Sequence, residues 1–263
     1  MYVTNAGALG VYLANPTADE PPIATVTSGL TRPYGVALDS SGKIYVADSA
    51  ADTVNIYPPE PQGNESPTVT ITQGLSGPTG IALDGSGKIY VANELSGAVQ
   101  IYGANPSGDE PPEATITQGL SDPMGLAVGP DGKLYVADYG GWLAIYPANA
   151  DSGTAPAVVI RSELGTPDAV ALDPAGNIYV ADASGSVNLY AADPIGDQPP
   201  LVMITNSLLI PSGVALDAGG KIYVSDVDAD NVKVYAASPR GDEPPLATLV
   251  TAINLPLGVA VGP

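Results

Sequence analysis

A seven-residue segment, Gly42-Lys43-Ile44-Tyr45-Val46-Ala47-Asp48, recurs along the chain and constrains its fold more than any other feature. Close copies occupy residues 87–93, 132–138, 176–182 and 220–226, and a shortened copy opens the chain at residues 2–5. The tyrosines of successive copies are therefore about 44 residues apart. A repeat of this length, centred on β-branched and aromatic residues, is typical of one four-stranded unit of a propeller.

Each repeat is expected to contain four short strands, which we call a, b, c and d. In the clearest repeat we predict these strands at residues 80–84, 89–93, 98–102 and 114–117. Glycines in the a–b turn allow positive φ angles, and prolines in the long c–d loop suit the end of an edge strand. The loops are thus expected to lie in two sets, the d–a and b–c loops on one face and the a–b and c–d loops on the other.

The two ends of the chain carry complementary parts of one repeat. Residues 258–261 have the pattern of strand a, and residues 2–27 contain strands b to d. We therefore predict an all-β fold, a six-bladed β-propeller with four antiparallel strands per blade. Its last blade is closed by the C-terminal strand together with the three N-terminal strands, and residues 1–263 form a single domain. Because the chain stops within an expected a–b turn, we also expect a domain excised from a longer precursor.

Composition narrows the classes of function. The chain has no cysteine and no histidine, which removes disulfides, thiolate chemistry and the commonest general base. Its formal net charge of −20 argues against nucleic acid and anionic membranes as partners, because both attract basic surfaces. No apolar run is long enough for membrane insertion, and no signal peptide is visible.

The motif Pro-x-Gly-Val-Ala-Leu-Asp, followed by Gly-Lys-Ile-Tyr-Val-Ala-Asp, resembles the NHL repeat and the related YVTN propeller repeat. The resemblance covers the whole chain and implies a propeller similar to streptogramin-lyase-like and gluconolactonase-like proteins. The lyases use a catalytic histidine, which this chain lacks. The lactonases hold a divalent cation with Glu, Asn and Asp, and Asp168, Glu163 and Asn254 match those ligands in type.

Several residues on the face of the d–a and b–c loops are not explained by the repeat. Of 14 tyrosines, twelve belong to strands b and c, which leaves Tyr34 and Tyr139, and the single tryptophan is nearby at Trp142. The residues at position x of the Pro-x-Gly motifs are expected to surround the mouth of the channel, and the fourth repeat places charged residues there. We predict a ligand site formed by Arg32, Tyr34, Met124, Tyr139, Trp142, Arg161, Glu163 and Asp168. Loop packing and a solvated ion pair remain the structural alternatives.

Acidic residues have both functional and structural interpretations. Asp226, Asp228 and Asp230 alternate in a way that would suit calcium, which is the one cofactor we consider. The Asp or Asn that ends every strand b is instead expected to cap its own b–c turn. By the expected positions of the loops, the face of the a–b and c–d loops carries 17 of the 28 acidic residues. This acidic face either keeps the protein soluble or attracts cations or a basic partner.

These features favour a non-enzymatic binding or scaffold module of a secreted or surface protein, with a glycan or a protein or peptide as ligand. We expect an extracellular, cell-surface or periplasmic location. One alternative is a calcium-dependent lactonase-like or lyase-like enzyme, and another is a self-associating structural subunit of a surface layer or filament.

Overall fold

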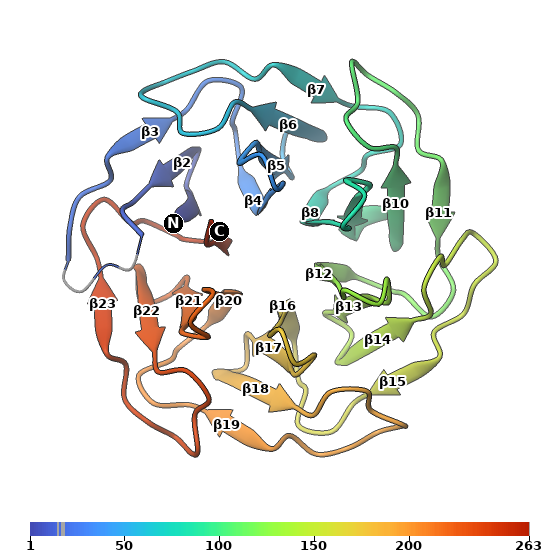
Figure 1. Ribbon diagram of the computed structural model, residues 1–263, viewed down its shortest axis with the longest axis vertical. Helices are drawn as coiled ribbons and strands as arrows, with labels where there is room; N and C mark the ends of the chain where they lie inside the picture. Colours follow the sequence, from blue (N-terminus) through green and yellow to red (C-terminus); the bar gives the residue numbers. More distant parts are fainter. Residues whose placement is uncertain (15, 17–18, 263) are drawn as a thin grey trace.

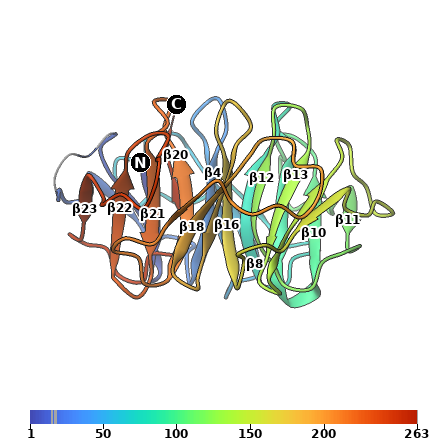
Figure 2. The same ribbon diagram turned by 90° about the horizontal axis from the view of Figure 1, so that it is seen from below.

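The computed structural model describes residues 1–14, 16 and 19–262, and they form a ring of six four-stranded antiparallel sheets around a central channel (Figure 1). Each sheet is one blade, and from the side the ring is a flat disc (Figure 2). The predicted six-bladed, all-β fold is thereby confirmed. The predicted c–d loop at residues 15–22 lies partly outside the described residues.

The four strand positions recur in every blade. The innermost strands a are β4 (Pro33–Leu38), β8 (Pro78–Leu83), β12 (Pro123–Val128), β16 (Pro167–Leu172), β20 (Pro211–Leu216) and β24 (Val259–Ala260). Strands b are β5 (Ile44–Asp48), β9 (Ile89–Asn93), β13 (Leu134–Asp138), β17 (Ile178–Asp182), β21 (Ile222–Asp226) and β1 (Tyr2–Asn5). Strands c are β6 (Thr53–Tyr57), β10 (Ala98–Tyr102), β14 (Trp142–Tyr146), β18 (Ser186–Tyr190), β22 (Asn231–Tyr235) and β2 (Ala8–Val11). The outer strands d are β7 (Val69–Ile71), β11 (Ala114–Ile116), β15 (Val158–Ile160), β19 (Val202–Ile204), β23 (Ala247–Leu249) and β3 (Ala24–Val26).

Blades 1 to 5 begin at β4, β8, β12, β16 and β20, and blade 6 consists of β24, β1, β2 and β3. A short 3-10 turn, η1 (Glu94–Ser96), connects β9 to β10. No helix in the described part of the chain is long and apolar enough to cross a membrane.

Blade 6 closes the ring as predicted. Strand β24 pairs with β1 through Tyr2↔Ala260 and Val3↔Val259. The Thr4 amide also donates to the Gly258 carbonyl at 3.0 Å, and the Leu257 amide donates to the Thr4 carbonyl at 3.0 Å. The two ends of the chain are therefore joined by backbone hydrogen bonds, and both lie near the centre of the ring in Figure 1.

The hydrophobic core lies between blades. Six clusters of buried side chains each combine residues from two neighbouring blades. The cluster between blades 1 and 2, for example, packs Tyr45 and Val54 of blade 1 against Ile89 and Val91 of blade 2. A blade buries its faces only when both neighbours are present, which is the reason that a repeat of this kind requires a closed ring.

The Pro-x-Gly motif begins strand a for two physical reasons. Proline can occupy the first residue of a strand because that position needs no ladder donor. The glycine is required where neighbouring inner strands approach: a Cβ on Gly80 would collide with the Met124 carbonyl, and one on Gly258 would collide with the Tyr34 carbonyl. The residue between them points into the channel, so this motif places one side chain per blade around the axis.

Candidate ligand surface and axial channel

Successive channel-facing residues of the six inner strands form three tiers. The face with the d–a and b–c loops is called the upper face, and the opposite face the lower face. The upper tier consists of Tyr34, Thr79, Met124, Asp168, Ser212 and Leu257; five of these are the x of Pro-x-Gly, and Asp168 is the x of Pro-Asp-Ala in blade 4. The middle tier consists of Val36, Ile81, Leu126, Val170, Val214 and Val259, and the lower tier of Leu38, Leu83, Val128, Leu172, Leu216 and Val261. Because alternate strand residues point the same way, six equal strands produce these rings.

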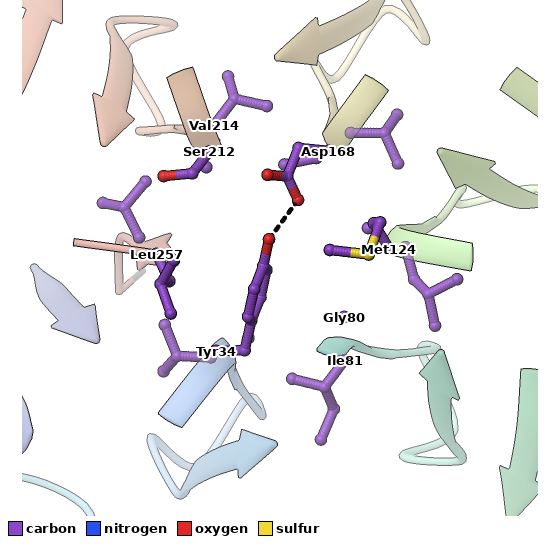
Figure 3. A pocket seen from close by; sticks show the side chains of 17 residues that line it. Tyr34, Gly80, Ile81, Met124, Asp168, Ser212, Val214 and Leu257 are labelled. Carbon is purple, nitrogen blue, oxygen red and sulfur yellow. Dashed lines mark hydrogen bonds between the residues drawn. The ribbon is translucent and has the colours of Figure 1, made fainter. Parts of the chain in front are cut away.

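A hydrogen bond crosses the upper tier. The Tyr34 hydroxyl, from blade 1, donates to Asp168 Oδ1, from blade 4, at 2.7 Å (Figure 3). These blades lie opposite each other in the ring, so the phenol ring spans the channel. Tyr34 is 9% exposed and Asp168 is 6% exposed. The upper end of the channel is therefore obstructed by a side chain rather than open to a large ligand.

The two other hydroxyls of the upper tier are turned toward the backbone. Thr79 donates to the Pro123 or Met124 carbonyl, both at 3.1 Å, and Ser212 donates to the Pro256 carbonyl at 2.8 Å. Beside the Tyr34–Asp168 bond remains a cavity of about 70 Å³, lined by residues of the upper and middle tiers. This volume holds a few water molecules, since one water molecule needs about 10–15 Å³ of such accessible space.

Asp168 is the most perturbed carboxyl of the channel. Burial raises its pKa to about 7, the Tyr34 hydrogen bond opposes that rise, and the charges of Glu94 and Asp182 add to it. Burial also raises the pKa of Tyr34, as does the neighbouring Asp168. The pair is thus a carboxyl that titrates near neutral pH beside a phenol that stays protonated.

The structure differs from the sequence prediction in where it places three of the eight proposed ligand residues. Tyr34, Met124 and Asp168 were expected at an accessible mouth, whereas all three are buried within the channel. Pro-x-Gly opens strand a itself, so the x side chain points toward the axis and not toward solvent. Arg32 is exposed, but it belongs to the loop between blades 6 and 1, across the ring from blades 3 and 4.

The other four residues lie on the upper face of blade 3 and on the loop that leads from blade 3 to blade 4, with the Trp142 side chain turned toward blade 2 and packed on the core between blades 2 and 3. The Arg161 guanidinium lies over the Trp142 ring, with 4.6 Å between its central carbon and the ring centroid. Trp142 is the first residue of β14, and its indole N–H donates to the Gly119 carbonyl at 3.1 Å. Tyr139, in the adjoining b–c turn, is 46% exposed. The indole is consequently half-buried and held in place, with a cation stacked on it.

A separate surface hollow lies further along the same loop, between blades 3 and 4, and neither Arg161 nor Trp142 lines it. Its volume is about 420 Å³, and it is lined by Glu163, Leu164 and Gly165, by residues 184–186 of the next b–c turn, and by Met203 and Thr205. Glu163 follows Arg161 in the same loop. We call Tyr139, Trp142, Arg161, Glu163 and this hollow the blade 3–4 surface.

Two of the three acids proposed for calcium have other partners. The buried Asp226 forms an ion pair with the equally buried Lys233 at 2.8 Å, and its carboxylate also accepts from the Leu209 and Ile210 amides. Asp230 accepts from the Leu255 amide at 2.7 Å, and Asp228 is exposed. Across the residues that the structure describes, no three acidic side chains are arranged to hold a metal ion.

Asp48, Asp138 and Asp182, which end b strands, cap their own b–c turns as expected and have a second structural role. Asp48 accepts from the Thr31 and Arg32 amides of the preceding d–a loop as well as from Ala51 in its own turn. Asp138 and Asp182 repeat this arrangement in their blades. They anchor the loop that leads into the channel strand, in addition to capping the b–c turn.

Sequence reasoning missed a second set of acids, which connect the blades. In five blades, a side chain of the c–d loop accepts hydrogen bonds from two backbone amides that directly follow strand d of the preceding blade. The accepting residues are Asp19, Asn64, Asp109, Asp197 and Asp242. We call these contacts the inter-blade clasps. The recurrence of Gly-Asp at residues 108–109, 196–197 and 241–242 was the available signal. Part of the acidic lower face is therefore structural.

Comparison with known proteins identifies the fold and no family. No family model matches the chain, and no curated protein matches it. The WD40 β-propeller domain of Doa1 is 13% identical with a TM-score of 0.67, over 89% of this chain and 73% of that one. A functionally unknown protein from Desulfotomaculum acetoxidans DSM 771 is 15% identical with a TM-score of 0.66, over 99% of this chain and 98% of that one. In all, 1321 solved chains match, and a fold shared so widely does not identify a function.

Proposed function

We propose that this protein is a non-enzymatic binding module that recognises a protein segment on the blade 3–4 surface. Of the two ligand classes left open by the sequence, a peptide fits this surface better than a glycan. Tryptophan, arginine and tyrosine are the residues most enriched at the energetic centres of protein interfaces, and this surface combines all three. The module is built from repeats that resemble the NHL and YVTN types.

The observation that carries the proposal is the Arg161–Trp142 stack beside a hollow. Nothing in the sixfold repeat requires either residue, because the other blades form equivalent turns without them. The exposed side of the guanidinium offers hydrogen-bond donors to a carboxylate or a carbonyl, and the hollow accepts an apolar side chain against Met203 and Leu164. The obstructed upper channel also favours a surface site over an axial one for a ligand of peptide size.

The experiment begins with selection of a random dodecapeptide display library on the immobilised protein. Trp142 is the only tryptophan, so its fluorescence reports binding of the enriched peptide directly. Isothermal titration calorimetry then compares the wild type with Trp142→Ala and Arg161→Ala. We expect each change to weaken binding at least about tenfold, as for a residue at the centre of an interface.

Arg240→Ala is the matched control, because it removes an exposed arginine from the c–d loop of blade 5 on the opposite face. It should leave the affinity unchanged. Peptides that bind Trp142→Ala and Arg161→Ala as tightly as the wild type would refute the proposed surface. A glycan array probed in parallel shows whether the other ligand class is favoured.

Location and assembly belong to the same proposal. We propose a secreted, cell-surface or periplasmic location, which is compatible with a net charge of −20 because high net charge favours solubility. Sedimentation velocity with and without calcium tests the structural alternative. Oligomers that form only with calcium would favour a surface-layer or filament subunit over a binding module.

A further inference from the structure

The axial channel contains a second, chemically different feature below the Tyr34–Asp168 bond. Its middle and lower tiers are entirely aliphatic, with one Val, Leu or Ile from every blade. Around the lower tier lies a hollow of about 500 Å³, lined by aliphatic residues of the inner strands of blades 1, 3, 4, 5 and 6 together with Asp39 and Ser40. We call this hollow the funnel; its wall is mainly aliphatic and has a polar edge at blade 1.

The funnel and the cavity beside Asp168 lie on the two sides of the middle tier. Val36, Val170, Val214 and Val259 line both the funnel and the 70 Å³ cavity. An unbranched aliphatic chain that entered from the lower face would thus lie along the tiers, with its leading end in the cavity. The cavity of about 70 Å³ has room for a small head group together with water molecules.

Asp168 determines which head group fits. Its Oδ1 accepts the Tyr34 hydroxyl, while Oδ2 borders the cavity and receives no protein hydrogen bond among the described residues. No lysine or arginine is among the residues described as lining the cavity, and the nearest charges that act on Asp168 are Glu94 and Asp182. A buried carboxylate without a counter-ion is costly, and a cation that fills the cavity would relieve that cost.

One acid also lies at the opening. Asp39 lines the funnel directly after the lower-tier residue Leu38. Its carboxylate accepts hydrogen bonds from its own a–b turn, which hold its pKa below the usual value, so it is an anion at the entrance. A negative charge there attracts cations.

We propose that the axial channel binds a linear primary alkylammonium ion, with its alkyl chain along the aliphatic tiers and its ammonium group on Asp168 Oδ2. The site is separate from the blade 3–4 surface and does not depend on the function proposed for it. Three ammonium hydrogens suit the free carboxylate oxygen and waters in the cavity.

The test uses n-hexylammonium and 1-hexanol, which share an alkyl chain and differ in charge. Calorimetric titration at pH 8 keeps the amine protonated and Asp168 ionised. For the wild type we expect the ammonium ion to bind about tenfold more tightly than the alcohol, as for a hydrogen bond to a charged group. In Asp168→Asn this ratio should fall to about one, while the affinity for 1-hexanol stays the same.

Two further variants separate the parts of the site. Leu216→Asn places an amide in the lower tier and should weaken both ligands severalfold. Arg161→Ala, on the blade 3–4 surface, should change neither. Equal affinity of the wild type for the two ligands, undiminished ammonium binding by Asp168→Asn, or no ammonium binding at all would overturn the proposal. The wild-type ratio is decisive by itself if a variant fails to fold.

Discussion

Asp168 is the residue at which packing and electrostatics conflict most. Its carboxyl is buried by the inner strands of a ring whose middle and lower tiers are aliphatic, and one phenol hydroxyl is its only described protein donor. Its folded-state pKa of about 7 is above the ordinary value of 3.8. The fold therefore favours the protonated acid. The stabilising contribution of Asp168 is fully present below about pH 4 and is lost as the pH rises to about 7. Above that pH the free energy of unfolding no longer changes through this group.

We expect Asp168→Asn to stabilise the protein at pH 8. The amide keeps an acceptor for Tyr34 and removes the buried charge, so the gain is at most about 4 kcal/mol, at ~1.4 kcal/mol per pKa unit. At pH 5 the gain should be clearly smaller, because the folded wild type is already protonated. Thermal melts of both proteins at the two pH values measure the difference.

Asp228→Asn is the matched control, since it removes the same charge from an exposed b–c turn. Its melting temperature should stay close to that of the wild type at both pH values. If Asp168→Asn lowered the melting temperature equally at pH 5 and pH 8, the carboxylate would be stabilising and its described environment would be wrong.

At the scale of structural elements, the c–d loops join the blades through the inter-blade clasps. Asp242, for example, accepts from the Thr205 and Asn206 amides at 2.7 and 2.6 Å, and also from the Thr205 hydroxyl. The Thr205 amide bond is the main reason that the pKa of Asp242 is held below its usual value. Because the folded pKa is lowered, the stability that this acid contributes is present above pH 4 and is lost as the pH falls.

Asp242→Ala should therefore lower the melting temperature at neutral pH, whereas Asp242→Asn should have little effect because an amide oxygen still accepts. Asn64 shows that asparagine can form a clasp in blade 1. For a chain of this size we expect a decrease of about 2–4 °C for alanine. Differential scanning calorimetry distinguishes the variants, and an equal loss in both would mean that charge rather than the hydrogen bonds matters.

At the scale of the whole molecule, closure by β24 holds the ring together. Deletion of residues 257–263 removes the partner of β1, exposes the core between blades 5 and 6, and leaves the Thr4 backbone bonds unmade. We expect the melting temperature to fall by roughly 10 °C or more. Deletion of residues 262 and 263 alone, which follow β24, is the control. A long deletion that melts within a degree or two of the parent would contradict closure of the ring by β24.

The acidic charge also acts on the molecule as a whole. With a formal net charge of −20 and most acids on the lower face, repulsion should destabilise the fold at low ionic strength. Raising sodium chloride from 10 to 150 mM shortens the Debye length from about 30 to about 8 Å, so the melting temperature should rise by a few degrees. A melting temperature that does not change with salt would indicate that bound ions already neutralise these charges.

The sequence alone was sufficient to predict the ring, because each requirement of a blade is local and is repeated six times. The alternation of strands b and c located β9 and β10 to the residue, and the glycine turns indicated where the strands reverse. The two complementary half-repeats predicted the pairing of β24 with β1.

The tertiary structure decided what the channel and the upper face contain. Tyr34 and Asp168 are 134 residues apart and meet only because ring closure places blades 1 and 4 opposite each other. The inter-blade clasps and the Arg161–Trp142 stack likewise depend on how loops of different strands or blades come together. A repeat determines the direction of a side chain within its blade, whereas its partner across the ring depends on the number of blades and their radius.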